Sequence, residues 1–65
     1  MKILYQGKEA ETDAATVAAF LAVQGVKSEE AVVELDGEIV AVDSVAATSL
    51  REDAVLNVFR IVAGG

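Results

Sequence analysis

The chain has 65 residues, a formal net charge of −6 and a pI near 4.3. This length permits one small domain, and an acidic surface repels the phosphate backbone of nucleic acids. The sequence contains no Cys and no His, which excludes disulfides, Cys/His zinc sites, Cys nucleophiles and His-dependent triads. We therefore expect no metal and no cofactor, and a protein that is not an enzyme in its own right.

Nothing in the sequence predicts a membrane-bound or divided chain. No segment approaches the roughly 20 apolar residues that span a bilayer, and residues 1–7 lack the long apolar core of a signal peptide. The chain contains no Pro, no linker and no internal repeat. We expect a single cytoplasmic domain over residues 1–65, without a membrane or nucleic-acid partner.

Alternating and helical patterns of apolar residues define the expected elements. In chain order they predict strands at 1–6 and 9–12, a helix at 17–24, strands at 31–36 and 38–42, a short helical turn at 43–50 and a strand at 55–62. Turns are expected at Gln6-Gly7-Lys8 and Asp36-Gly37. In the short helical turn, we expect Asp43 to act as a cap and Val45 and Leu50 to point inward. This order predicts an α+β roll, in which one main helix packs on one face of a mixed sheet.

The main helix is marked by its caps and by an apolar stripe. Thr16 is the expected N-cap, and Gly25 is the expected left-handed residue after the last turn. Val17, Phe20 and Leu21 follow helical spacing. We therefore expect this stripe to face the sheet.

The last strand has two different faces. Asn57 would be costly to bury in mid-strand without partners, whereas Arg60 lies near the sheet end and can reach water. The even-numbered residues are therefore expected to face the core, which puts Phe59 and Ile61 on the outer face, beside Leu4 of the first strand. A contiguous apolar patch of this kind marks a partner surface. The alternative is that these residues are only partly exposed or cover a loop.

The chain continues from Val62 into Ala63-Gly64-Gly65. One interpretation is a frayed terminus, which is common at chain ends. The other depends on sterics, because a flexible di-glycine without Cβ atoms can pass through a narrow channel and carry its carboxylate into another protein's active site. The position of the glycines directly behind an apolar strand, in a small acidic α+β roll, favours the second interpretation.

Together these features resemble the ubiquitin-like sulfur carriers, a family with the β-grasp fold, and most closely the ThiS type of thiamine biosynthesis. The resemblance covers the whole chain and rests on Met1-Lys2-Ile3-Leu4-Tyr5, Thr16-Val17, Phe20-Leu21, Ile39-Val40 and the segment from Phe59 to Gly65. The length favours this branch over the longer MoaD-type subunits of molybdopterin synthase.

The chain departs from the family pattern at two places. Ala41, Val42 and Val45 stand where such carriers often have Pro, Arg and an aromatic residue. Glu52-Asp53-Ala54 stands where they often have Asp-Gly-Asp. We expect the turn at Glu52-Asp53-Ala54 to be kept despite this change, since Asp tolerates left-handed backbone.

The resemblance implies that Gly65 is the site of covalent chemistry. An ATP-dependent adenylyltransferase of the ThiF or MoeB type would adenylate its carboxylate, and a donor such as a cysteine desulfurase would supply the sulfur of a thiocarboxylate. A thiazole synthase of the ThiG type would accept that sulfur. The implied partner-binding and tail residues are Leu4, Phe59, Arg60, Ile61, Val62, Ala63 and Gly64. For Arg60, an ion pair with the activating enzyme and a structural role within the domain are equally consistent with the sequence.

Three alternatives to the thiamine assignment remain open. The same carrier chemistry serves molybdopterin synthesis or another thiolated metabolite such as cysteine in related proteins. A ubiquitin-like modifier would join Gly65 to lysines through isopeptide bonds, and a non-covalent binding module would not need the tail. The acidic residues Glu29, Glu30, Glu34, Asp36 and Glu38 either steer the chain towards basic partners or maintain solubility.

Overall fold

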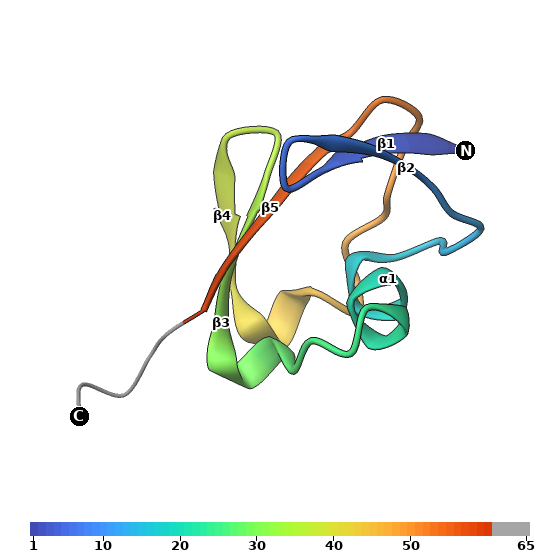
Figure 1. Ribbon diagram of the computed structural model, residues 1–65. Coiled ribbons are helices and arrows are strands. Elements are labelled where there is room, and N and C mark those ends of the chain that lie inside the picture. Colours follow the sequence, from blue (N-terminus) through green and yellow to red (C-terminus); the bar gives the residue numbers. More distant parts are fainter. Residues whose placement is uncertain (61–65) are drawn as a thin grey trace.

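The computed structural model describes residues 1–60, which form one mixed sheet with a helix on one face (Figure 1). The elements in chain order are β1 (Lys2–Tyr5), β2 (Lys8–Glu11), α1 (Val17–Val23), a 3₁₀ turn (Ser28–Glu30), β3 (Ala31–Leu35), β4 (Glu38–Val40), a second 3₁₀ turn (Val42–Ser44) and β5 (Val55–Arg60). The α+β roll expected from the sequence is confirmed.

The sheet consists of two hairpins joined by the last strand. The strand order is β2-β1-β5-β3-β4, so β2 and β4 lie at the edges and β5 lies in the centre. β5 runs parallel to β1 and antiparallel to β3. In Figure 1 it crosses the molecule diagonally between the two hairpins. This arrangement places the chain that follows β5 at the end of the central strand.

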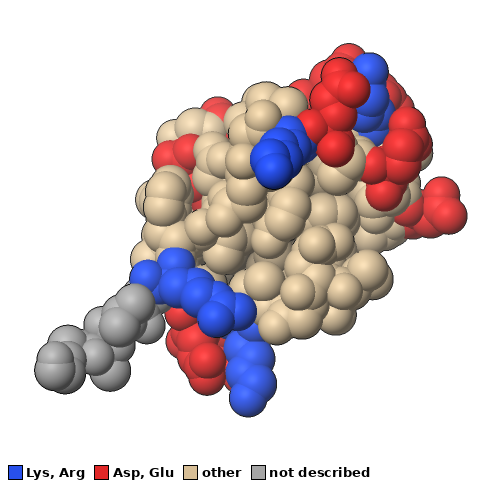
Figure 2. Space-filling model, in the orientation of Figure 1, with Lys and Arg blue, Asp and Glu red and all other residues tan. Residues whose placement is uncertain are grey.

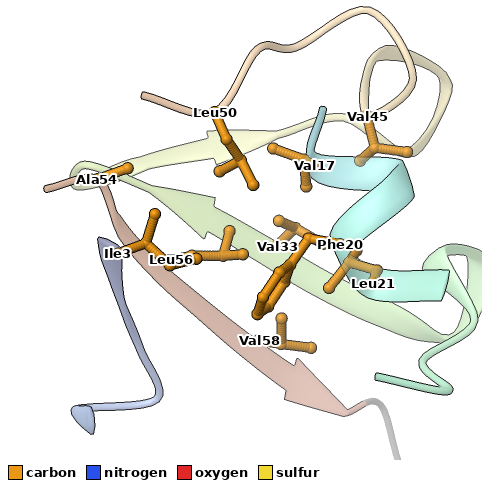
Figure 3. Close-up of a cluster of buried hydrophobic side chains, with 10 residues drawn as sticks. All are labelled: Ile3, Val17, Phe20, Leu21, Val33, Val45, Leu50, Ala54, Leu56 and Val58. Carbon is orange, nitrogen blue, oxygen red and sulfur yellow. The ribbon is translucent and has the colours of Figure 1, made fainter. Parts of the chain in front are cut away.

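The core fills the space between the sheet and α1 (Figure 3). Val17, Phe20 and Leu21 of α1 are all buried, as their spacing predicts. The ring of Phe20 meets that of Tyr5 edge to face, with 4.8 Å between the ring centroids. The other buried apolar residues are Ile3, Val33, Val45, Leu50, Ala54, Leu56 and Val58.

Both ends of α1 have the predicted caps. The Thr16 hydroxyl accepts a hydrogen bond from the Ala19 N–H at 3.1 Å, which satisfies one of the free donors of the first turn. Gln24 is the C-cap, and Gly25 follows it with a φ of +73°. These caps place the apolar stripe of a helix of only seven residues against the sheet.

The segment after Ile39 differs from the sequence-based expectation. The expected strand at 38–42 ends at Val40, because Ala41 turns the chain into the 3₁₀ turn at Val42–Ser44. Asp43 is therefore inside this turn and does not cap it, and Ala41 is the N-cap without a side-chain hydrogen bond. The inward positions of Val45 and Leu50 are confirmed, since both side chains are buried.

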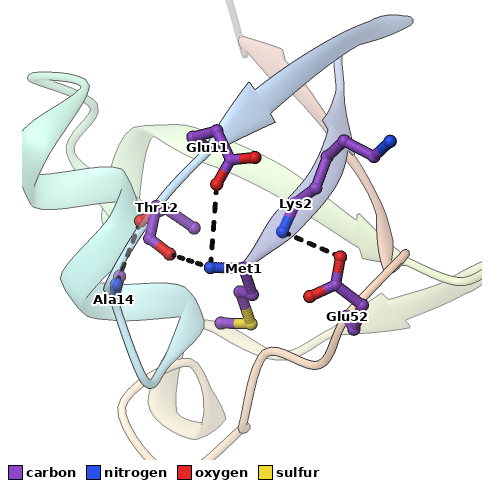
Figure 4. A network of polar contacts seen from close by, with 6 residues as sticks. All are labelled: Met1, Lys2, Glu11, Thr12, Ala14 and Glu52. Carbon is purple, nitrogen blue, oxygen red and sulfur yellow. Dashed lines mark hydrogen bonds and ion pairs between the residues drawn. The ribbon is translucent and has the colours of Figure 1, made fainter.

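A group of polar contacts ties the start of β1 to its neighbours (Figure 4). The N-terminal ammonium group of Met1 donates to the Thr12 carbonyl at 2.9 Å, and Glu11 lies 3.8 Å away. The Lys2 N–H donates to Oε2 of Glu52 at 3.0 Å. The loop before β5 is thereby attached to β1. Asp53 in that loop has a φ of +66°, so the turn survives there as predicted.

Candidate functional site

The outer sheet face is the side of the sheet opposite α1. Strand alternation and the pairing register place ten side chains on it: Lys2, Leu4, Glu9, Glu11, Val32, Glu34, Ile39, Val55, Asn57 and Phe59. Phe59 is 54% exposed and Ile39 is 65% exposed, whereas their neighbours Leu56 and Val58 in β5 are buried on the other side. The predicted orientation of the last strand is thus confirmed for Val55–Arg60.

One detail of the predicted patch is wrong. Leu4 is on the outer sheet face, but its partner in the adjacent strand is Val55 and not Phe59. Phe59 lies opposite Val32 of β3. The parallel pairing of β1 with β5 stops at Leu56, so Leu4 and Phe59 mark two separate ends of the same face.

A polar pair lies between these two apolar ends. Asn57 is half-buried, and its Nδ2 donates to Oε1 of Glu34 at 3.1 Å across the β5–β3 pairing. Asp36 also has a structural partner, because its Oδ1 accepts the Val55 N–H at 2.8 Å. Neither contact could be predicted from the sequence, since cross-strand partners depend on the register. These two carboxylates therefore contribute to the sheet as well as to the surface charge.

Arg60 lies at the end of the described part of β5. It is exposed, and it lines a pocket of about 160 Å³ together with Lys27, Glu30 and Ala31. Among residues 1–60, no carboxylate lies within ion-pair distance of the Arg60 guanidinium. A pocket with two basic side chains thus borders the end of the central strand in a chain that is acidic overall.

Charged side chains are unevenly distributed over the surface. On the face shown in Figure 2, acidic groups gather at the end where Figure 1 places the β1–β2 hairpin and the loop before β5. The middle of this face is largely uncharged. No helix within residues 1–60 has the length and apolar character needed to cross a membrane.

The remaining predicted site residues lie outside the described residues. These are Ile61, Val62, Ala63, Gly64 and Gly65. Of the predicted site residues within residues 1–60, Leu4 and Phe59 share the outer sheet face. Arg60 is one of the even-numbered residues of β5, which point to the core side of the sheet, but its side chain reaches solvent at the sheet end, as predicted.

Comparison with known proteins extends these observations. The model of the ThiS family matches residues 3–65. The chain is similar to a crystal structure of the thiamine biosynthesis protein ThiS from Geobacter metallireducens, with 26% identity, a TM-score of 0.84 and full coverage of both chains. It is also similar to an NMR solution structure of a thiamine biosynthesis protein from that organism, with 26% identity, a TM-score of 0.79, and coverage of 100% of this chain and 88% of that one. None of the curated proteins matches the chain.

The structural likeness extends over the whole described sheet and α1. The five-stranded mixed sheet with one helix is the β-grasp fold that the resemblance implied. The family match begins within β1 and includes the two final glycines, so it covers both the folded domain and the tail sequence. The chain belongs to the ThiS family.

Proposed function

We propose that the protein is a sulfur carrier of thiamine biosynthesis whose Gly65 carboxylate is converted to a thiocarboxylate. One observation carries this proposal: the ThiS family match continues through Gly64 and Gly65, directly behind the central strand β5. The similarity to ThiS from Geobacter metallireducens supports the thiamine pathway as the destination of the sulfur.

The proposed chemistry takes place at the C-terminal carboxyl group. A free α-carboxyl is an anion at neutral pH and a poor electrophile, so it needs activation. One of its oxygens attacks the α-phosphorus of ATP on an adenylyltransferase, which forms an acyl-adenylate and releases pyrophosphate. Sulfide then attacks the carbonyl carbon and AMP leaves, which produces the thiocarboxylate. With a persulfide donor such as a cysteine desulfurase, a thiol must afterwards cleave the resulting acyl disulfide. A thiazole synthase is the proposed acceptor.

The domain's own contribution is to bind and to present the tail. Phe59 is a large exposed ring on the outer sheet face, only five residues before Gly64. Leu4 and Val55 form a second apolar area at the far end of this face, beyond the Asn57–Glu34 pair. We propose that the activating enzyme covers the outer sheet face, and that Arg60 forms an ion pair with it beside the tail. Ile61, Val62, Ala63 and Gly64 lead the carboxylate into its active site.

The test of the proposed function is the intact mass of the untagged protein isolated from its own cells. We expect a species in which one sulfur replaces one oxygen, and fragmentation is expected to assign it to Gly65. Incubation with the adenylyltransferase, ATP and sulfide is expected to increase this species. A ladder of conjugates with other proteins, without any thiocarboxylate, would instead support a ubiquitin-like modifier.

Replacement of Phe59 by alanine is expected to weaken activation without unfolding the domain. Aromatic side chains at interfaces often contribute more than about 1 kcal/mol to binding. We therefore expect the KM of the adenylyltransferase for this protein to rise roughly tenfold. The cost in stability is expected to stay below about 1 kcal/mol, because the ring is 54% exposed. Steady-state pyrophosphate release and urea denaturation measure the two effects.

The matched control for this prediction is Val23→Ala. Val23 is 79% exposed, but it lies at the end of α1, away from the outer sheet face. This variant is expected to keep the wild-type KM. An equal rise in KM for both variants would show that the outer sheet face is not the docking surface.

A further inference from the structure

Gln6 has a backbone conformation that is unfavourable for its residue type. It lies in the turn between β1 and β2 with a φ of +53°, and Gly7 follows with a φ of +80°. Positive φ at both central residues is typical of a type I′ hairpin turn, which favours Asn or Gly at the first position. A longer side chain in this conformation carries a steric cost. The contacts of the Gln6 side chain offset this cost.

The Gln6 carboxamide forms two hydrogen bonds with the backbone of β5. Its Nε2 donates to the Val58 carbonyl at 2.8 Å, and the Val58 N–H donates to its Oε1 at 2.8 Å. The backbone N–H of Gln6 also donates to the Leu56 carbonyl at 3.1 Å. Because β1 ends at Tyr5, the carboxamide takes the place of the next backbone unit of β1.

These bonds lie on the edge of β5 that faces β1. The Leu4 N–H donates to the Ala54 carbonyl on the same edge at 2.8 Å, and alternate residues of a strand direct their backbone groups to the same side. Val58 and Arg60 therefore follow on this edge, whereas Asn57 is directed towards β3. The carboxamide thus pairs the last backbone groups on this edge before Arg60, where the described part of β5 ends.

We propose that Gln6 is a positioning residue for the C-terminal carboxylate. Its carboxamide clamps the end of β5 to the β1–β2 hairpin, so the chain beyond Arg60 starts from a fixed point on the sheet. This inference rests on the proposed function. A partner that contacts the outer sheet face and the carboxylate together requires a fixed spacing between them, and pre-organisation reduces the entropy lost on binding. Gln6 touches no reacting atom, so it acts on binding and not on the chemical step.

The variant Gln6→Asn is expected to remove the hydrogen bonds to Val58 while keeping the turn between β1 and β2. Asn is favoured at this position of the turn, but its side chain is one methylene shorter and does not reach Val58. We expect amide hydrogen exchange at Val58 to become about tenfold faster, while the Asn57 amide, which faces β3, keeps its wild-type rate. We expect the KM of the adenylyltransferase for this protein to rise about 3- to 10-fold with kcat unchanged. A change of this size corresponds to the loss of one to two ordinary hydrogen bonds. Lys8→Gln, at an exposed residue of the same hairpin, is the control and is expected to change neither quantity.

The outcomes distinguish this inference from the function on which it rests. An unchanged exchange rate at Val58 in Gln6→Asn would show that the clamp is not formed in solution. Faster exchange with an unchanged KM would overturn the positioning role alone. If the wild-type protein is never adenylated, the proposed function is overturned, and the positioning role that rests on it is overturned as well.

Discussion

Deletion of Gly64 and Gly65 is expected to abolish adenylation and thiocarboxylate formation while leaving the free energy of unfolding unchanged. The two residues have no side chains to bury, and the buried core of the described domain consists of residues between Ile3 and Val58. The deletion leaves a carboxylate at Ala63, two residues short of the proposed reaction site. ATP–pyrophosphate exchange measures activation, and thermal unfolding by circular dichroism measures stability.

Two controls sharpen this experiment. Addition of a single alanine after Gly65 keeps both glycines but moves the carboxylate, and we expect it to be inactive as well. Gly64→Ala keeps the length but adds a Cβ, and we expect reduced activation if the tail passes through a narrow channel. Normal adenylation of the truncated protein would contradict the carrier role and leave a non-covalent binding module as the better interpretation. A large loss of stability would show that the tail is part of the folded core.

Replacement of Phe20 by alanine is expected to be the most destabilising change in the domain. Phe20 is 1% exposed and lies between α1 and the sheet, where its ring meets that of Tyr5. Removal of a buried Phe costs about 3–5 kcal/mol, whereas a chain of 65 residues has a total stability of about 3–10 kcal/mol. We therefore expect the variant to be partly or fully unfolded at room temperature, as measured by urea denaturation with far-UV circular dichroism.

Phe59→Ala provides a natural comparison, since it makes the same chemical change on the opposite side of the sheet. Phe20→Leu, which keeps most of the buried volume, is expected to cost about 1–2 kcal/mol. The three variants together test the assignment of the two sides of the sheet. Similar stabilities for Phe20→Ala and Phe59→Ala would show that α1 does not cover the core as described.

Local patterns were sufficient to predict most of the fold. Thr16 and Gly25 mark the ends of α1 because capping depends on a few neighbouring residues. The Asp36-Gly37 turn was predicted for a similar reason, and both residues have positive φ. The period-two pattern of β5 also predicted that Phe59 would be exposed and Val58 buried.

Features that depend on register could not be predicted in this way. The pairing of Leu4 with Val55 results from the offset between strands that are distant in the sequence. The clamp between Gln6 and Val58 joins residues 52 positions apart, and the only local signal was a Gln in a turn that favours Asn. Asp43 was expected to cap the turn but lies inside it. The reason is that the chain leaves the sheet already at Ala41, so the turn begins at Val42. The roles of the tail residues remain predictions, and the family match includes these residues in its range of 3–65.

The central position of β5 also determines when this fold can assemble during protein synthesis. The β1–β2 and β3–β4 hairpins are local, because each pairs only residues that are close in the sequence. Neither pairs with the other, because β5 lies between them in the sheet. Until residues 55–60 are available, the two hairpins therefore lack their shared partner strand, and their inner edges are unpaired. Because residues 61–65 follow β5 in the chain, the proposed activation at Gly65 can take place only after the central strand has been synthesised.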